Sequence, residues 1–228
     1  YKTAGTIPVY KNDFNEFNLR CENQETLNTI YALTATIEAK DRYTYGHSKK
    51  VRAYAVALAK AIGLPFDRVN IINHAALLHD IGKISIGDTI LNKRSSLSED
   101  EWELVKNHPV ISMSIVAHVP RLVLCLPAIL HHHERWDGKG YPYGLKGRDI
   151  PFEARILTVA DSFDAMTSVR PYRNALPPEK VIKELQDGAG SQFDPDLVEA
   201  FLPIARRELR TLKLQKMALN DSTVEQSL

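Results

Sequence analysis

The chain has 228 residues, of which 44% are hydrophobic and 25% are charged. This composition is typical of a globular protein and excludes a disordered or collagen-like chain. The formal net charge is only +1, from 29 basic and 28 acidic side chains, so no nucleic-acid partner is expected, because such binders carry a strong basic excess. The longest apolar run, residues 122–130, is too short to span a membrane.

Apolar side chains recur at helical spacing almost throughout, so the sequence predicts an all-α fold. Gly63 ends the second helical stripe, and Ser98 with Glu101 forms a capping box at the start of the fourth. Pro109 marks the start of the next helix. The expected helices cover residues 23–40, 51–62, 65–82, 99–107, 109–119, 121–132, 153–168, 178–187 and 195–212.

One long irregular segment, residues 134–151, interrupts the helices and is rich in glycine. Long loops inside compact domains often carry function. The two ends of the chain are more polar than the middle. We therefore expect residues 1–22 to be a linker or the end of an upstream region, 23–212 to be one helical domain with an N-terminal linker helix, and 213–228 to be a polar tail.

Cysteine and histidine are used very differently in this chain. The two cysteines, Cys21 and Cys125, lie far apart and cannot form a disulfide framework or a thiolate zinc site, so we expect a reducing compartment, the cytoplasm. Eight histidines are present, and most lie in the middle half of the chain. Because imidazole is the commonest metal ligand and a physiological acid or base, this clustering predicts a functional site.

Four short segments combine imidazole and carboxylate groups. Taken singly, each has an ordinary alternative: a His-Asp pair often occurs by chance at a helix end, and a lone histidine is usually a packed or surface residue. A carboxylate on an apolar helix face has a desolvation cost that a cation would offset. The segments are His79-Asp80, His108, His131-His132-His133-Glu134, and Asp161 with Asp164 three residues later.

Together these groups offer nitrogen and carboxylate ligands from four separate helices and no thiolate. Such a donor set suits iron, manganese or another divalent ion better than a structural zinc. A carboxylate flanked by several histidines can bridge two metal ions. Two ions roughly 3.5–4 Å apart activate water and stabilise the leaving oxygen in phosphoryl hydrolysis. The residues themselves therefore predict a helical, dinuclear phosphohydrolase.

The ordered set of motifs resembles the HD-GYP domain, the branch of the HD superfamily whose members typically hydrolyse cyclic di-GMP. An isolated His-Asp pair would be a weak signal, but the whole set over about residues 25–205 is specific. The resemblance implies a compact helical HD-type bundle with a long GYP loop. It rests on DRYTYGHS (41–48), LHDIGK (78–83), HP (108–109), HHERWDGKGYP (132–142), ADSFDAMTS (160–168), RPYR (170–173) and GAGSQFDP (188–195).

The same resemblance implies a set of metal ligands, with Asp80 as the bridge between two ions: His79, Asp80, His108, His132, His133 and Asp161. His131 is then a spare residue that packs beside the ligands. His47 matches a histidine that serves a third metal in some members, but those members carry a glutamate four residues earlier, where this chain has Tyr43. A neutral phenol is a poor ligand for a divalent ion. We therefore expect two divalent ions, iron or manganese, with His47 unligated or outside the direct ligand set.

Catalysis is assigned by the resemblance to His79, Asp80 and Lys83. Lys83 lies one helical turn beyond His79, where its ammonium would point at a substrate phosphate, although the helix dipole also favours a lysine at that end.

Arginine suits phosphate and guanine edges, glycine permits close backbone approach to a ligand, and tyrosine can stack on a base; a plain turn is the alternative for the GYP segment. The implied substrate-binding residues are Lys83, Gly140, Tyr141, Asp164, Arg170 and Arg173.

The implied activity is hydrolysis of cyclic di-GMP to linear pGpG, with a second cut to GMP in some members. Two alternatives stay open: hydrolysis of another cyclic dinucleotide or nucleotide phosphate, and an inactive module that binds cyclic di-GMP or a GGDEF domain. The expected partners are an upstream sensory or receiver domain, GGDEF-domain proteins and a second copy of the chain.

Overall fold

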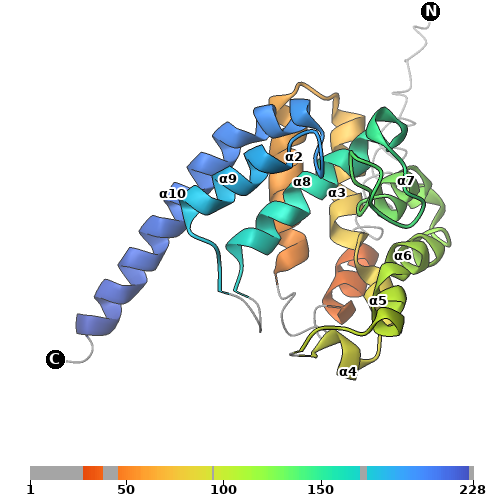
Figure 1. Cartoon of the computed structure of the whole chain (residues 1–228), viewed down its shortest axis with the longest axis horizontal. Helices are drawn as coiled ribbons and strands as arrows, with labels where there is room; N and C mark the ends of the chain where they lie inside the picture. The colour runs from red at the N-terminus through yellow and green to blue at the C-terminus, as the bar shows by residue number, and fades with distance from the viewer. Residues whose placement is uncertain (1–27, 38–45, 94, 170–173, 226–228) are drawn as a thin grey trace, which may run out of the picture.

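The computed structural model describes residues 28–37, 46–93, 95–169 and 174–225, and the fold is a bundle of helices (Figure 1). No β-strand occurs among these residues, where a single isolated bridge joins Ala189 to Phe193. The predicted all-α class is therefore confirmed. Within the same ranges, no helix is both long enough and apolar enough to cross a membrane.

Residues 28–37 are helical, and twelve further α-helices or short 3-10 helices follow in the described part of the chain. In chain order the elements are α2 (His47–Ala61), α3 (Phe66–Leu78), η1 (Ile81–Ser85), α4 (Asp88–Leu91), α5 (Glu99–Lys106), α6 (His108–Val116), η2 (Pro120–Cys125), α7 (Leu126–Leu130), η3 (Gly147–Asp149), α8 (Phe152–Thr167), α9 (Pro178–Gly188) and α10 (Pro195–Glu225), where η marks a 3-10 helix.

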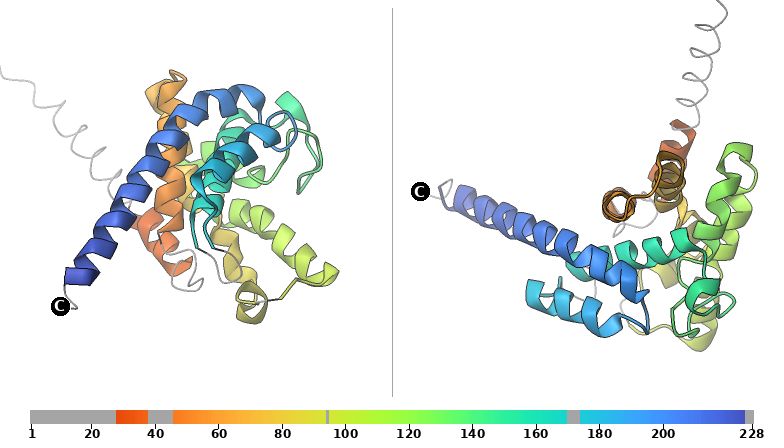
Figure 2. Two further views of the ribbon diagram at one scale, coloured as in Figure 1. Left: turned by 60° about the vertical axis from the view of Figure 1, so that its left-hand side comes forward. Right: turned by 90° about the horizontal axis from the view of Figure 1, so that it is seen from above.

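Helices α2, α3 and α8 pack against one another at the centre of the bundle. Helices α9 and α10 cover one side of this core, and α6 and α7 cover the other (Figures 1 and 2). Along α8, the consecutive side chains of Ile156 and Leu157, and then Val159 and Ala160, are all inaccessible to solvent. A helix that is apolar around most of its circumference is a buried helix. Helix α8 is therefore the central helix of the bundle.

Several helix ends differ from the sequence prediction for clear physical reasons. The helix expected to reach residue 82 ends at Leu78, and a 3-10 turn follows. The helix expected over residues 121–132 is divided into η2 and α7, because Pro127 lacks an N–H and is tolerated only in a first turn. Helix α10 continues to Glu225 rather than ending near residue 212, since residues 204–225 contain neither proline nor glycine.

A tight contact between η1 and α6 brings two of the predicted metal-ligand segments together. A Cβ atom on Gly82 would lie 2.1 Å from the carbonyl oxygen of His108, so only glycine allows this approach. The Gly82 N–H donates to Ser112 Oγ at 2.8 Å, and that hydroxyl donates to the carbonyl oxygen of His79 at 2.7 Å. Buried Ser112 therefore joins the end of α3 and the start of η1 to α6, which begins with His108.

Candidate metal centre

Three buried histidines are oriented by the same kind of local hydrogen bond. Each ring donates its Nδ1 proton to a carbonyl three residues earlier, in the last turn of the helix that has just ended. Since a carbonyl oxygen can only accept, Nε2 of each neutral ring keeps its lone pair. The pairs are His79 with Ala76 at 2.8 Å, His108 with Val105 at 2.7 Å, and His132 with Ile129 at 2.7 Å.

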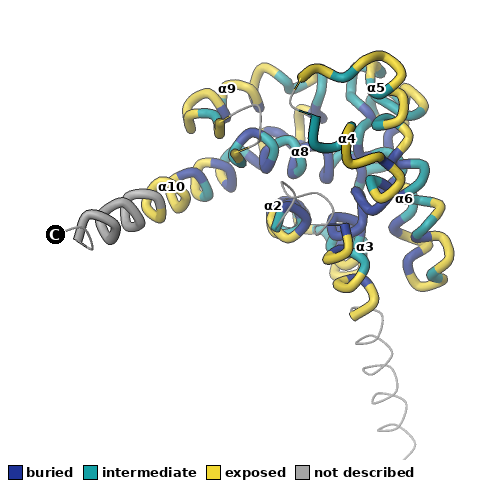
Figure 3. Tube along the Cα trace, turned by 90° about the horizontal axis from the view of Figure 1, so that it is seen from below, coloured by how far each residue is buried: buried dark blue, intermediate teal, exposed yellow. Residues whose placement is uncertain are grey.

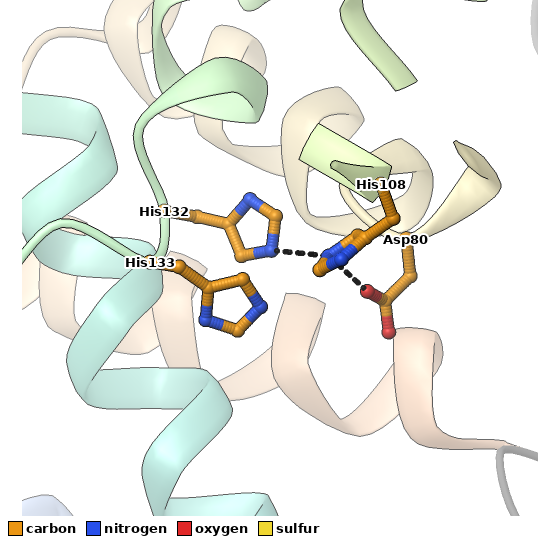
Figure 4. Close-up of side chains that lie close together, drawn as sticks. All are labelled: Asp80, His108, His132 and His133. Carbon is orange, nitrogen blue, oxygen red and sulfur yellow. Dashed lines mark hydrogen bonds and ion pairs between the residues drawn. The ribbon is translucent and has the colours of Figure 1, made fainter. Parts of the chain in front are cut away.

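The freed Nε2 atoms of His108 and His132 face each other, and that of His108 also meets the Asp80 carboxylate (Figure 4). His108 Nε2 lies 3.4 Å from His132 Nε2 and 3.2 Å from Asp80 Oδ1. With His133, these three residues present one ligand atom each within 4.8 Å of one another. Lone pairs that face each other this closely repel unless a cation lies among them, so the donor set fits a metal ion.

A second group of possible ligands shares Asp80 with the first. His47, His79 and Asp80 also present ligand atoms within 4.8 Å of one another. His79 Nε2 is buried and has no hydrogen-bond partner in the described part of the chain. His47 Nε2 lies 3.6 Å from Asp80 Oδ2 and 3.4 Å from Asp161 Oδ1. Two groups joined by one carboxylate are the arrangement that a dinuclear centre requires.

The charges of the buried groups are those that metal binding needs. Burial alone would raise the pKa of Asp80, but the Lys83 ammonium and the neighbouring imidazoles hold that pKa well below its usual range. Burial, together with the surrounding imidazoles, holds the pKa values of His132 and His133 well below the ordinary histidine value. These shifts favour an ionised Asp80 carboxylate beside neutral His132 and His133 rings, which can coordinate a metal ion without losing a proton.

His47 lies beside the predicted ligands Asp80 and Asp161. Its Nδ1 donates to Asp164 Oδ2 at 2.7 Å, which directs Nε2 toward Asp161 and Asp80. Burial lowers the pKa of His47, but this hydrogen bond and the negative charges of Asp161 and Asp80 outweigh it and hold the pKa above its ordinary value. A carboxylate that holds the far nitrogen of a ligand histidine is a common support for a metal site.

Asp164 was expected to contact the substrate, and the structure places it elsewhere. Its side chain is only 2% exposed and does not line the cavity beside the metal centre. Besides the bond from His47, it accepts one from Ser168 Oγ at 3.2 Å. Both of its oxygens are therefore engaged inside the protein, where Asp164 supports His47, and its contact with the substrate stays a prediction.

A cavity of about 340 Å³ opens beside the two groups of ligands. Among the expected residues, its wall includes Asp80, Lys83, His132, His133, Tyr141 and Asp161. Lys83 belongs to the 3-10 turn η1, so it does not share an α-helical face with His79 as expected, yet its side chain still reaches the cavity. Its Nζ lies 2.6 Å from Asp80 Oδ2.

The GYP loop is shaped by contacts within its own segment. The buried carboxylate of Glu134 accepts the backbone N–H of Tyr143 at 2.8 Å and that of Leu145 at 3.0 Å. Tyr141 stacks on His133, with ring centroids 4.8 Å apart. A Cβ on Gly140 would lie 2.4 Å from the backbone nitrogen of Arg135. Glycine is therefore required here for close approach to the loop's own backbone, and the expected contact of Gly140 with a ligand stays a prediction.

Two of the predicted substrate-binding residues, Arg170 and Arg173, lie outside the residues that the structure describes, and so does Tyr43. Conversely, some residues of the cavity were not predicted. The cavity wall also includes Trp102 and Gln192, to which the sequence analysis gave no role. Gln192 lies in a segment that carries the family resemblance, whereas the only signal for Trp102 was an aromatic residue on a short, mostly polar helix.

Comparison with known proteins gives a consistent result. Residues 32–197 match the family model described as HD domain. The cyclic di-GMP phosphodiesterase of Thermotoga maritima is 43% identical over 171 residues, which cover 74% of this chain and 46% of that protein. The 3'3'-cGAMP-specific phosphodiesterase 2 of Vibrio cholerae is 36% identical over 192 residues, which cover 83% and 37%. The crystal structure of the V. cholerae cyclic GMP-AMP phosphodiesterase V-cGAP3 superposes with a TM-score of 0.60 at 19% identity, covering 77% of this chain and 47% of that one.

The chain belongs to the HD domain family. Its resemblance to the HD-GYP branch of that family is confirmed. HD domains bind divalent metal ions, and the two groups that share Asp80 have the donor chemistry for them. The chain spans less than half the length of the two curated relatives described above.

Proposed function

We propose that this chain is a metal-dependent phosphodiesterase that hydrolyses cyclic di-GMP to linear pGpG. The observation that carries the proposal is the pair of ligand groups that share Asp80, set beside a cavity lined by Lys83 and Tyr141. The name of the T. maritima relative supports the same substrate. An inactive binding module would have no need for so complete a set of converging donor atoms.

The proposed ligands fall into two sets around Asp80. His108, His132 and His133 belong to the first set. The second set comprises His79 and Asp161, with His47 beside them. We propose iron or manganese, because the donors are imidazole and carboxylate without thiolate. When bound, two such ions would supply Lewis-acid activation of water and stabilise charge on the phosphate.

The chain's own residues then position the substrate. Lys83 is placed to hold a phosphate oxygen, because its ammonium reaches the cavity next to the ionised Asp80. In the reaction, the oxygen of water bonds to phosphorus and one P–O3′ bond breaks. Breakage of this bond opens the ring to pGpG, and the leaving 3′ oxygen takes up a proton. A second hydrolysis of the remaining linkage would give two molecules of GMP.

The test is product analysis on protein of known metal content. The chain is purified without oxygen, its iron and manganese are quantified, and it is incubated with cyclic di-GMP before chromatography. We expect pGpG to accumulate, followed by GMP where the second cut occurs. Binding of cyclic di-GMP by metal-loaded protein with no product would instead identify a binding module and overturn the proposal.

A second substrate deserves the same assay, because the V. cholerae relatives are named as specific for 3'3'-cGAMP and cyclic GMP-AMP. That dinucleotide replaces one guanine with adenine and leaves both phosphodiester linkages in place. Faster turnover of 3'3'-cGAMP than of cyclic di-GMP would change the proposed substrate but keep the proposed reaction.

The wider setting is proposed from the sequence resemblance. We propose residues 23–212 as the catalytic domain, preceded by a linker in residues 1–22 and followed by a polar tail in 213–228. An upstream sensory or receiver domain, GGDEF-domain proteins and a second copy of the chain are the proposed partners. The proposed compartment is the cytoplasm, in keeping with the reduced, buried thiol of Cys125.

A further inference from the structure

Trp102 is a large aromatic residue that lies on the cavity wall without being buried. Its side chain is 45% exposed, and helix α5, which carries it, buries none of its residues (Figure 3). The ring therefore contributes little to the hydrophobic core. It lines the same cavity as Lys83 and Asp80, so whatever binds beside the metal centre meets the indole.

The indole forms a corner with a second aromatic ring. Trp102 and Tyr141 have centroids 6.2 Å apart and planes that meet at 76°. Tyr141 in turn lies nearly parallel to His133, at 4.8 Å and 29°. One face of Tyr141 is thus covered by His133. The aromatic series runs outward from the metal centre and ends at Trp102, whose ring keeps a large accessible surface.

The position of Trp102 is fixed by polar contacts at the start of its helix. Glu101 N–H donates to Ser98 Oγ at 3.2 Å, and the Glu101 carboxylate accepts the Ser98 N–H at 2.7 Å. The same carboxylate pairs with Lys93 Nζ at 2.5 Å. These contacts involve the residue directly before Trp102. A helix without a buried face is therefore still held in place where the indole meets the cavity.

We propose that the Trp102 indole stacks on one base of the cyclic dinucleotide whose phosphate lies at Lys83. This inference rests on the proposed function and adds a base-binding residue to it. A nucleobase is flat and aromatic, and stacking on an indole suits any purine, so Trp102 contributes affinity for both guanine and adenine.

The experiment compares three variants in the metal-loaded protein. Trp102→Ala removes the ring, Trp102→Phe keeps a smaller ring, and Trp136→Phe is the matched control. The chain has two tryptophans, and the Trp136 ring packs against the Arg155 guanidinium, 5.8 Å from its centroid. Steady-state kinetics with cyclic di-GMP give KM and kcat separately. Quenching of tryptophan fluorescence by a phosphorothioate analogue, which resists hydrolysis, reports direct contact.

Loss of one base stack weakens binding by about ten- to a hundredfold. We expect Trp102→Ala to raise KM by about this factor, Trp102→Phe to recover most of the loss, and Trp136→Phe to keep the wild-type KM. Quenching should persist in Trp136→Phe and disappear in Trp102→Phe.

An unchanged KM in Trp102→Ala overturns the inference, and a lower unfolding midpoint in that variant would then show that the indole only covers the loop. Failure of the proposed function gives a different result. In that case the metal-loaded wild-type protein forms no product from any cyclic dinucleotide, whichever tryptophan is present.

Discussion

Ser112 offers the sharpest test of how the metal centre is assembled. Its hydroxyl accepts a hydrogen bond from the Gly82 N–H and donates one to the His79 carbonyl oxygen, and all three residues are buried. Ser112→Ala removes both hydrogen bonds and introduces no bulk. The Gly82 N–H and the His79 carbonyl then lose their partners in a place that water does not reach.

The expected cost follows from these two groups. A buried polar backbone group that loses its partner destabilises the folded state by about 1–3 kcal/mol, so two such groups amount to about 2–6 kcal/mol. This is a large share of the roughly 5–15 kcal/mol that stabilises a typical domain. Because His79 and Asp80 are carried by the loosened segment, we also expect metal affinity to fall by about 10- to 100-fold, as for other residues that support metal ligands.

Two measurements separate these effects. Urea unfolding of the metal-free protein gives the change in the free energy of unfolding, and competition with a chelator gives metal affinity. Ser114→Ala is the matched control, because Ser114 lies on the same helix and is exposed. If Ser112→Ala behaves like Ser114→Ala in both assays, the reasoning about this contact is refuted.

Four further predictions concern the site itself. Asp80→Ala should abolish turnover and release metal, because a shared carboxylate holds both ions; near-normal metal content, measured by elemental analysis, would contradict the shared role. Lys83→Ala should lower kcat while metal content stays unchanged, since its proposed contact is the phosphate; loss of metal would show that the lysine supports the ligands instead. Fully loaded protein should hold two metal ions per chain, and three strong anomalous peaks, one of them at His47, would disprove this number. Stability of the metal-free protein, followed by urea unfolding, should fall as pH drops below about 6.5, because the lowered pKa values of His132 and His133 let the unfolded chain take up protons first. His47, whose pKa is raised, acts in the opposite sense, so stability that stays level or rises on acidification would show that its contribution prevails.

The sequence was most informative where chemistry is concentrated in short motifs. His79 and Asp80 are adjacent, and His132 and His133 lie in one run, so the residues that converge on Asp80 could be named before the fold was known. The helical class was equally accessible, because an apolar stripe depends only on local spacing. Helix ends were less so: the 3-10 turn after Leu78 depends on the close contact of Gly82 with α6.

Features that depend on distant parts of the chain could not be predicted. Asp164 and His47 are 117 residues apart, and no local pattern indicates that one carboxylate will orient that ring. The approach of Trp102 to Tyr141 likewise depends on how α5 and the GYP loop meet in space. The contact of Gly140 with the backbone of its own loop is a third such feature, because it depends on how the loop folds back on residues 133–135.

The histidines at the ends of α3, α5 and α7 have a consequence for how such a centre withstands sequence change. Each ring takes its orientation from a carbonyl only three residues away, so a peptide of four residues already determines which nitrogen faces the metal. Substitutions elsewhere in the bundle can shift these helix ends as rigid pieces, and the donor atom stays the same. The distances between the helix ends can then change while each histidine still offers the same atom. For an engineer, the transferable unit is therefore the final helical turn together with the histidine that follows it.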